Sequence, residues 1–181
     1  MTLKKLPLVL LLSSAAFAAP MHYTITGNSM ANFNFRVTLI PVPGETPDVQ
    51  ADLSFDPANL QKISGSIKVD LRSLNTGIAL RDEHARNFLG VAEHPSAEFK
   101  ISRISGIKKL QAGQELQGFA EGSFALKGVV KPLKAPIKVR FDGKTIFVTT
   151  KFDVVLKDHH INIPGADDAT DVMVQFNLKS R

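Results

Sequence analysis

The sequence predicts an all-β protein made of about eight antiparallel strands, with one short helix. Apolar and polar residues alternate through most of the chain after Tyr23, and this period of two is typical of half-buried strands. Short turn signals rich in Gly, Pro and Asp separate the alternating runs. Only residues 74–90 show helical spacing instead.

The strands are expected in eight alternating runs. In NFNFRVTLI, every second residue from Phe33 to Leu39 is apolar, so these side chains should share one face of the sheet. PVPGETP at 41–47 is expected to be a stiff loop, and Asp142-Gly143 is a strong signal for an antiparallel hairpin. The other runs are VQADLSF, GSIKVDL, AEFKISRI, GFAEGSFALKG, APIKVRF, TIFVTTKFDVVL and DVMVQFNL.

The segment LNTGIALRDEHARNFLG predicts a helix, because Leu80, His84 and Phe88 are spaced four apart. Residue 75 or 76, Asn or Thr, is the expected N-cap, and Gly90 is the expected C-terminal stop. A single helix among eight strands is expected to lie across one mouth of a closed barrel.

Eight antiparallel strands can form a sandwich or close into a barrel, and closure removes the exposed sheet edges. A small closed barrel is either filled by side chains or holds one apolar ligand. Gly65, Gly118, Ala120 and Gly122 fall on inward positions. These small residues are therefore expected to leave room along the barrel axis.

Residues 1–18 are interpreted as a cleavable signal peptide. A basic start at Lys4 and Lys5 precedes an apolar run and a small-residue pattern that ends at Ala18. The apolar run is about half of the roughly 20 residues that a membrane-spanning helix needs. We therefore expect one domain at 19–181, periplasmic or secreted.

Composition excludes several classes of protein. The chain has no cysteine, so it contains neither a disulfide nor a lipid-modified N-terminal cysteine. Residues 1–18 hold two lysines and no acidic residue, so their removal lowers the formal charge from +5 to about +3. The remaining lysines are scattered rather than gathered into a stripe, and nucleic-acid binding is not expected.

No catalytic residue and no metal site are predicted. The chain has no Gly-x-Ser-x-Gly turn, and His84 or His94 could act as a base but has no evident reacting partner. The adjacent His159 and His160 would face opposite sides of a strand. A metal site assembled from histidines that are distant in sequence stays open.

The charged residues of the helical segment are interpreted as structural. Arg81, Asp82, Glu83 and Arg86 can form pairs along or beside the helix, while its apolar residues dock onto the barrel. His84 shares the face of Leu80 and is expected to be a hydrogen-bonded packing residue at the mouth.

Three segments resemble the signature of the YceI-like family. The first, at 69–101, is VDLRSLNTGIALRDEHARNFLGVAEHPSAEFKI, with a Ser-Leu-x-Thr turn followed by Arg-Asp-x-His and His-Pro. The second is GSFALKGVVKPLKAPIKV at 122–139, and the third is FDVVLKDHHINIPG at 152–165. Together with the signal peptide, the resemblance covers nearly the whole mature chain.

This resemblance implies an elongated, lipocalin-like eight-stranded antiparallel barrel with a helix near one end. It also implies an exported protein, without catalytic residues or a cofactor, that binds a polyprenyl lipid or a quinone tail. The His159-His160 pair replaces an aromatic-Gly pair that is common in the family, so it could alter the cavity wall. No stable membrane insertion is expected; transient membrane contact and a homodimer stay open.

The expected lining of the cavity consists of inward apolar or small residues, each of which could equally be ordinary core. The alternatives are a filled-core adaptor or stress-response protein of the cell envelope and a weak enzyme that depends on His84 or His94. The expected mouth consists of Arg81, Asp82, His84 and Phe88. The expected lining residues are Phe33, Phe35, Val37, Ile67, Val69, Phe99, Ile101, Ala120, Gly122, Phe124, Leu126, Val148, Phe152, Val154, Val174 and Phe176.

Overall fold

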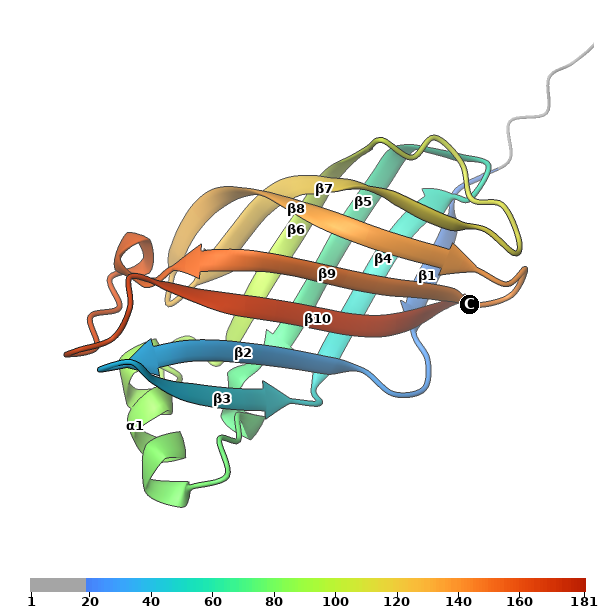
Figure 1. The fold of residues 1–181 in the computed structure, drawn as a ribbon. Coiled ribbons are helices and arrows are strands. Elements are labelled where there is room, and N and C mark those ends of the chain that lie inside the picture. The colour runs from blue at the N-terminus through green and yellow to red at the C-terminus, as the bar shows by residue number, and fades with distance from the viewer. Residues whose placement is uncertain (1–18) are drawn as a thin grey trace, which may run out of the picture.

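The computed structural model describes residues 19–181, so the predicted signal peptide at 1–18 lies outside the described residues. Long strands wrap into a barrel, and the helix lies beside one end of it (Figure 1). The strands are β1 (Met21–Ile25), β2 (Met30–Val37), β3 (Ile40–Thr46), β4 (Val49–Asp56), β5 (Asn59–Asp70), β6 (Ser96–Ser105), β7 (Glu115–Leu126), β8 (Val129–Phe141), β9 (Ile146–Val155) and β10 (Ala169–Ser180). The helix is α1 (Ala79–Leu89), and two 3-10 turns are η1 (Leu71–Ser73) and η2 (Leu156–His159).

Eight of these strands form a closed antiparallel ring. They follow the order β1-β4-β5-β6-β7-β8-β9-β10, and β10 pairs back with β1. This confirms the predicted eight-stranded antiparallel barrel. The turn between β8 and β9 is the predicted hairpin, where the Asp142 carboxylate accepts hydrogen bonds from the backbone N–H groups of Lys144 and Thr145.

Strands β2 and β3 form a hairpin outside this ring. β10 pairs with β1 through Leu178–Ser180 and with β2 through Asp171–Gln175, so both strands use one edge of β10. The prediction of a single strand in NFNFRVTLI is wrong, because the chain reverses at Thr38 and Leu39 with φ angles of 50° and 68°. Leu39 is 83% exposed at the tip instead of inward. Apolar and polar residues alternate on both sides of a hairpin turn, so this pattern does not show where the chain reverses direction.

The segment PVPGETP, predicted to be a loop, forms most of β3. Proline has no backbone N–H, and it is tolerated here because β3 is the outer strand of the hairpin. On this outer edge, the backbone N–H of Glu45 donates to the carbonyl oxygen of Asn75, and the N–H of Asn75 donates to that of Glu45, both at 2.9 Å. Because every second residue of a strand faces the same edge, Pro41 and Pro43 also direct their nitrogen atoms outward.

Large side chains fill the barrel end that lies far from α1. Leu60, Ile146 and Leu178 are each 2% exposed, and Tyr23 stacks on Phe55 with ring centroids 4.1 Å apart. A second buried cluster packs at the α1 end. It consists of Leu71, Val91, Ala97, Leu126, Val154, Leu156 and Ile161.

The inward glycines do not leave room along the axis, contrary to the expectation from sequence. A Cβ atom at Gly122 would collide with the carbonyl oxygen of Lys100 on β6, and one at Gly118 would collide with that of Ser105. Gly65 has a φ of 122° and meets the backbone of β4 in the same way. These glycines therefore allow neighbouring strands to approach closely, next to the irregular register between β6 and β7.

We predict that Gly122→Ala lowers the free energy of unfolding by about 1–3 kcal/mol, because the new methyl group forces β6 and β7 apart. Denaturant unfolding of the purified protein measures this effect. The control is Ser123→Ala on the outer face of β7, expected to change stability by less than about 0.5 kcal/mol. Equal stability of the Gly122→Ala variant and the wild type would show that the strands separate without strain.

Candidate functional site

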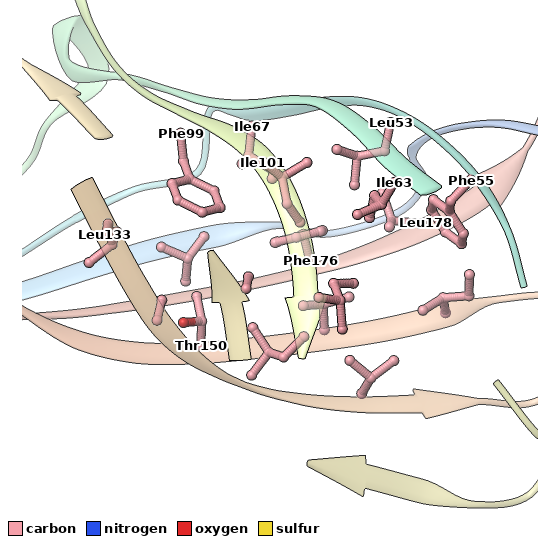
Figure 2. Close-up of a pocket in the computed structure, with 18 of the residues that line it drawn as sticks. Leu53, Phe55, Ile63, Ile67, Phe99, Ile101, Leu133, Thr150, Phe176 and Leu178 are labelled. Atoms are coloured by element: carbon pink, nitrogen blue, oxygen red, sulfur yellow. The ribbon is translucent and has the colours of Figure 1, made fainter. Parts of the chain in front are cut away.

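An apolar cavity of about 120 Å³ lies inside the ring. Figure 2 shows Leu53, Phe99 and Phe176 among the side chains around it. Among the described residues that line it, Thr150 is the one with a polar side chain, and its hydroxyl donates to the carbonyl oxygen of Pro136 at 2.8 Å. This cavity therefore offers a ligand apolar contacts alone.

A second cavity, of about 130 Å³, lies at the α1 end of the barrel. Barrel strands form part of its wall, and Phe33 and Phe35 of β2 close it on one side. Ala85 and Leu89 of α1 cover it, together with the loop at 161–163. The hairpin outside the ring and the helix thus extend the interior of the barrel beyond the ring itself.

The two cavities meet in the middle of the barrel. Both are lined by Val69, Ala97, Phe124, Phe152 and Val174. The rings of Phe124 and Phe152 meet edge to face, with centroids 6.0 Å apart, and both rings line both cavities. A ligand that occupies both cavities must therefore pass these two rings. We call the two cavities together the bore.

The structure places most of the expected lining residues around the bore. Ile67, Phe99, Ile101, Ala120, Val148 and Phe176 line the first cavity, Phe33, Phe35, Leu126 and Val154 line the second, and Val69, Phe124, Phe152 and Val174 line both. Two residues that were expected in the lining, Val37 and Gly122, line neither cavity. Val37 lies next to the hairpin tip, where it bridges to Ala166, and Gly122 faces the backbone of β6.

Other lining residues were missed in the sequence. Leu53, Ile63, Ile137 and Leu178 belong to strands or runs with clear alternation, so the same inward pattern could have found them. Ala85, Leu89 and Ile163 lie on the helix or in a loop, where no period of two exists. Their positions depend on how α1 and the loop fold over the barrel.

The helix begins later than the sequence suggests. The N-cap is Ile78, without a side-chain hydrogen bond, instead of Asn75 or Thr76, whereas Gly90 ends α1 in the left-handed conformation as predicted. Thr76 does not cap the helix but is bound by a helix residue, Asp82. The backbone N–H of Thr76 donates to the Asp82 carboxylate at 2.6 Å, and the Thr76 hydroxyl donates to the same carboxylate. The helix N-terminus is therefore fixed to the preceding loop through Asp82.

The buried face of α1 also differs from the predicted one. His84 is exposed and Leu80 is 61% exposed, whereas Ala85 is buried and Leu89 lines the second cavity. Phe88, expected at the mouth with His84, packs against the second buried cluster. None of the four expected mouth residues lines either cavity. In this orientation, residues 81, 82 and 86 of the helix make polar contacts with the preceding loop.

These polar contacts hold the loop at 74–77 against α1, while the backbone pairing of Asn75 with Glu45 joins the same loop to β3. The Arg81 guanidinium donates to the Thr76 hydroxyl at 2.9 Å, and Arg86 donates to the carbonyl oxygen of Leu74 at 3.2 Å. The hydrogen bond from the Thr76 hydroxyl is the main reason that the pKa of Asp82 lies below its usual value. Since Leu74 lines the second cavity, this network fixes one side of its wall.

The two adjacent histidines lie in and after η2, not in a strand. His159 is 4% exposed, and its ring meets Phe124 edge to face with centroids 5.5 Å apart. Its Nδ1 lies 3.2 Å from the carbonyl oxygen of Val129, so Nδ1 carries the proton and donates. His160 is exposed. His159 therefore supports the ring of Phe124 from behind and lies outside the lining of the bore.

Within residues 19–181, no group of three or more His, Cys, Asp or Glu side chains gathers in a way that could hold a metal ion. In the same part of the chain, no helix has the length and apolar character needed to cross a membrane. The candidate site is therefore the bore, together with the polar contacts between α1 and the loop at 74–77.

Comparison with known proteins places the chain in a family. A model of the YceI-like domain matches residues 22–180. The chain belongs to the YceI-like family. A UPF0312 protein of Vibrio cholerae serotype O1 is 28% identical to this YceI-like protein over 187 aligned positions, which cover 94% of each chain.

Two solved structures from other bacteria share the fold. BcnA of Burkholderia cenocepacia matches this YceI-like protein with a TM-score of 0.70 and 17% identity, over 82% of this chain and 95% of BcnA. A polyisoprenoid binding domain from Saccharophagus degradans, implicated in plant cell wall breakdown, matches with a TM-score of 0.73 and 16% identity. That match covers 89% of this chain and 99% of the other domain. At these identities the likeness shows the fold.

We predict that Asp82→Asn destabilises the protein near neutral pH and that the difference from the wild type shrinks in acid. Because the folded-state pKa of Asp82 is lowered, its ionised form stabilises the fold above the unfolded-state pKa of about 3.9. This stabilisation is lost as the pH falls through the folded-state pKa. Thermal unfolding between about pH 7 and about pH 2 measures both proteins across this window.

The control for this prediction is Glu83→Gln, because Glu83 is the exposed neighbour on the same helix. We expect its Tm to follow the wild-type Tm at every pH. A difference between Asp82→Asn and the wild type that stays constant down to the lowest pH would contradict the role of the ionised carboxylate.

Proposed function

We propose that this protein is an exported binding protein that holds a long isoprenoid lipid, such as a polyprenyl lipid or a quinone tail, inside the bore. The observation that carries the proposal is the pair of adjacent cavities, which share five lining residues and have almost entirely apolar walls. The polyisoprenoid binding domain from Saccharophagus degradans, which shares the fold, supports this choice of ligand. Transport, storage and stress protection are all roles that such a carrier could serve.

Burial of the chain would supply the affinity. An isoprenoid tail has a large apolar surface, and its transfer out of water is favourable by about 25 cal/mol for each square ångström buried. Isoprene units are short and branched, so they suit a wall built from Ile, Leu, Val and Phe side chains. Binding of this kind needs neither a cofactor nor a reacting group.

The bore must adapt to take a long chain. An apolar cavity of roughly 150 Å³ holds a molecule the size of benzene, so each cavity fits only a short part of an isoprenoid. Rotation of Phe124 and Phe152 would join the two spaces, because these rings line both cavities. We propose that a bound chain displaces these rings and runs along the axis through both cavities.

We propose a binding role rather than an enzymatic one. The two histidines considered as bases do not line the bore: His84 is exposed on α1, and the ring of His94 lies against the β7–β8 turn at Gly128. Neither histidine is placed to act on a ligand in either cavity. An enzymatic role would require that the protein turns over an isoprenoid and that a His84→Ala or His94→Ala variant loses this turnover.

The first experiment is to purify the mature protein from an exporting bacterial host without detergent. Its mass is then compared under native and denaturing conditions, and any released ligand is fragmented. We expect a stoichiometric apolar adduct with an isoprenoid fragmentation series. If no adduct forms, even after incubation with quinones and polyprenyl lipids, the protein is a filled-core adaptor or stress-response protein instead.

We predict that Ala120→Phe abolishes lipid binding while the barrel stays folded, because the new ring fills the first cavity. The matched control is Ala125→Phe, since residue 125 lies on the same strand but on the opposite face from Ala120. Native mass spectrometry should show the adduct in the control and not in Ala120→Phe, with similar circular dichroism spectra for both. Undiminished binding in Ala120→Phe would place the ligand outside the bore.

We also predict that the exported protein begins at Ala19. Expression of the full chain in a bacterial host, followed by cell fractionation, should place it in the periplasm or the medium. Intact mass should match cleavage after Ala18. Recovery of the uncleaved chain from the cytoplasm would contradict export.

A further inference from the structure

One residue that lines the second cavity, Thr170, has a buried polar group without a partner. The hydroxyl of Thr170 on β10 is the one buried side-chain polar atom within residues 19–181 that makes no hydrogen bond. Thr170 is 8% exposed and lines this cavity, on the inward face that it shares with Val172 and Val174. A buried hydroxyl without a partner costs stability, so its presence here calls for a partner in the cavity.

The other polar side chains at this cavity are differently placed. The hydroxyl of Thr46 is within hydrogen-bonding distance of Ser73 Oγ at 2.6 Å and donates to the carbonyl oxygen of Asp70 at 2.9 Å. Asn32 is half-buried on the boundary with an outer surface groove. Thr170 is therefore the one buried hydroxyl of this cavity that is free to bond a ligand within the part of the chain that the structure describes.

The charge of the cavity wall restricts the ligand further. Among the described residues that line the second cavity, no side chain is charged. A diphosphate or carboxylate placed here would lose its hydration without gaining a cationic partner, which is strongly unfavourable. A neutral oxygen atom requires only one hydrogen bond, and Thr170 can supply it.

The shape of the bore fixes the direction of the ligand. The end far from α1 is filled by Leu60, Ile146 and Leu178, each 2% exposed, and the first cavity there has no free polar group. An apolar tail can occupy the first cavity, whereas an oxygen atom finds its partner only in the second cavity, near α1. The ligand would thus lie with its tail deep in the ring and its oxygen-bearing end under the helix.

We infer that Thr170 hydrogen-bonds a neutral oxygen at one end of the bound isoprenoid, and that the protein selects isoprenoid alcohols or quinones over isoprenoid hydrocarbons and diphosphates. This inference rests on the proposed function and specifies the headgroup and orientation of its ligand. The hydroxyl of Thr170 donates to a quinone carbonyl, or exchanges a hydrogen bond with an alcohol, in a wall without charged side chains where the Thr46 hydroxyl is already bonded.

The test uses ligands that share one tail. Native mass spectrometry of the purified mature protein measures which ligand is bound from equimolar mixtures of geranylgeraniol, the matching hydrocarbon, geranylgeranyl diphosphate, and a quinone with the same tail. We expect the wild type to prefer the alcohol or the quinone over the hydrocarbon. Replacing Thr170 with valine should lower this preference roughly threefold to tenfold, the size expected for one hydrogen bond.

The matched control is Thr149→Val, which makes the same substitution on β9 at a residue that lines neither cavity. Removal of its hydroxyl should leave the preference for oxygen unchanged, because Thr149 alternates with the inward residues of the strand. The two variants should also differ without ligand. Thr170→Val should raise Tm by roughly 2–4 °C, because it removes an unpaired buried hydroxyl, whereas Thr149→Val should not.

The outcomes separate this inference from the proposed function. A reduced preference for the alcohol alone, or for the quinone alone, in Thr170→Val supports the inference and identifies the headgroup. Equal preference in Thr170→Val and the wild type overturns it, even if all ligands bind. Stronger wild-type binding of the diphosphate than of the alcohol also overturns it. Failure of every ligand, the hydrocarbon included, to bind the wild type instead rejects the proposed function.

Discussion

The barrel depends on a short pairing between its first and last strands. β1 meets β10 only from Tyr23 to Ile25, opposite Leu178 to Ser180. The rest of that edge of β10 pairs with β2, so the sheet closes tightly at one end and is covered by the hairpin and α1 at the other. This asymmetry explains why large side chains fill one end, while a cavity with a polar group lies at the other.

The cover at the α1 end is held by polar contacts as well as by the packing of Phe88 and Leu89 on the second buried cluster. Ala85 is the one buried residue of α1, and the loop before the helix is fixed by Asp82, Arg81 and Arg86. Such contacts lie near the solvent and can break singly, whereas a packed core gives way only as a unit. A cover of this kind could open far enough to admit a chain without unfolding the ring.

The sequence predicted the ring well because alternation records which side of a strand faces the core, and this held for Phe99, Phe124 and Phe176. It failed where the chain turns within an alternating run, as at Leu39, and at glycines such as Gly122, whose effect depends on the backbone of the next strand. The unpaired hydroxyl of Thr170 was also hidden, because threonine is common in strands and only the surrounding atoms show whether its hydroxyl has a partner.

The outer edge of β3 also bears on how copies of the protein meet. At the three positions whose nitrogen atoms face outward, Pro41 and Pro43 have no N–H to offer, and the N–H of Glu45 is bonded to Asn75. A second chain that approached this edge would find no donor from these positions with which to extend the sheet. The edge of β3 is therefore a poor template for an unfolded neighbour, because it can offer carbonyl acceptors but no donors at these positions.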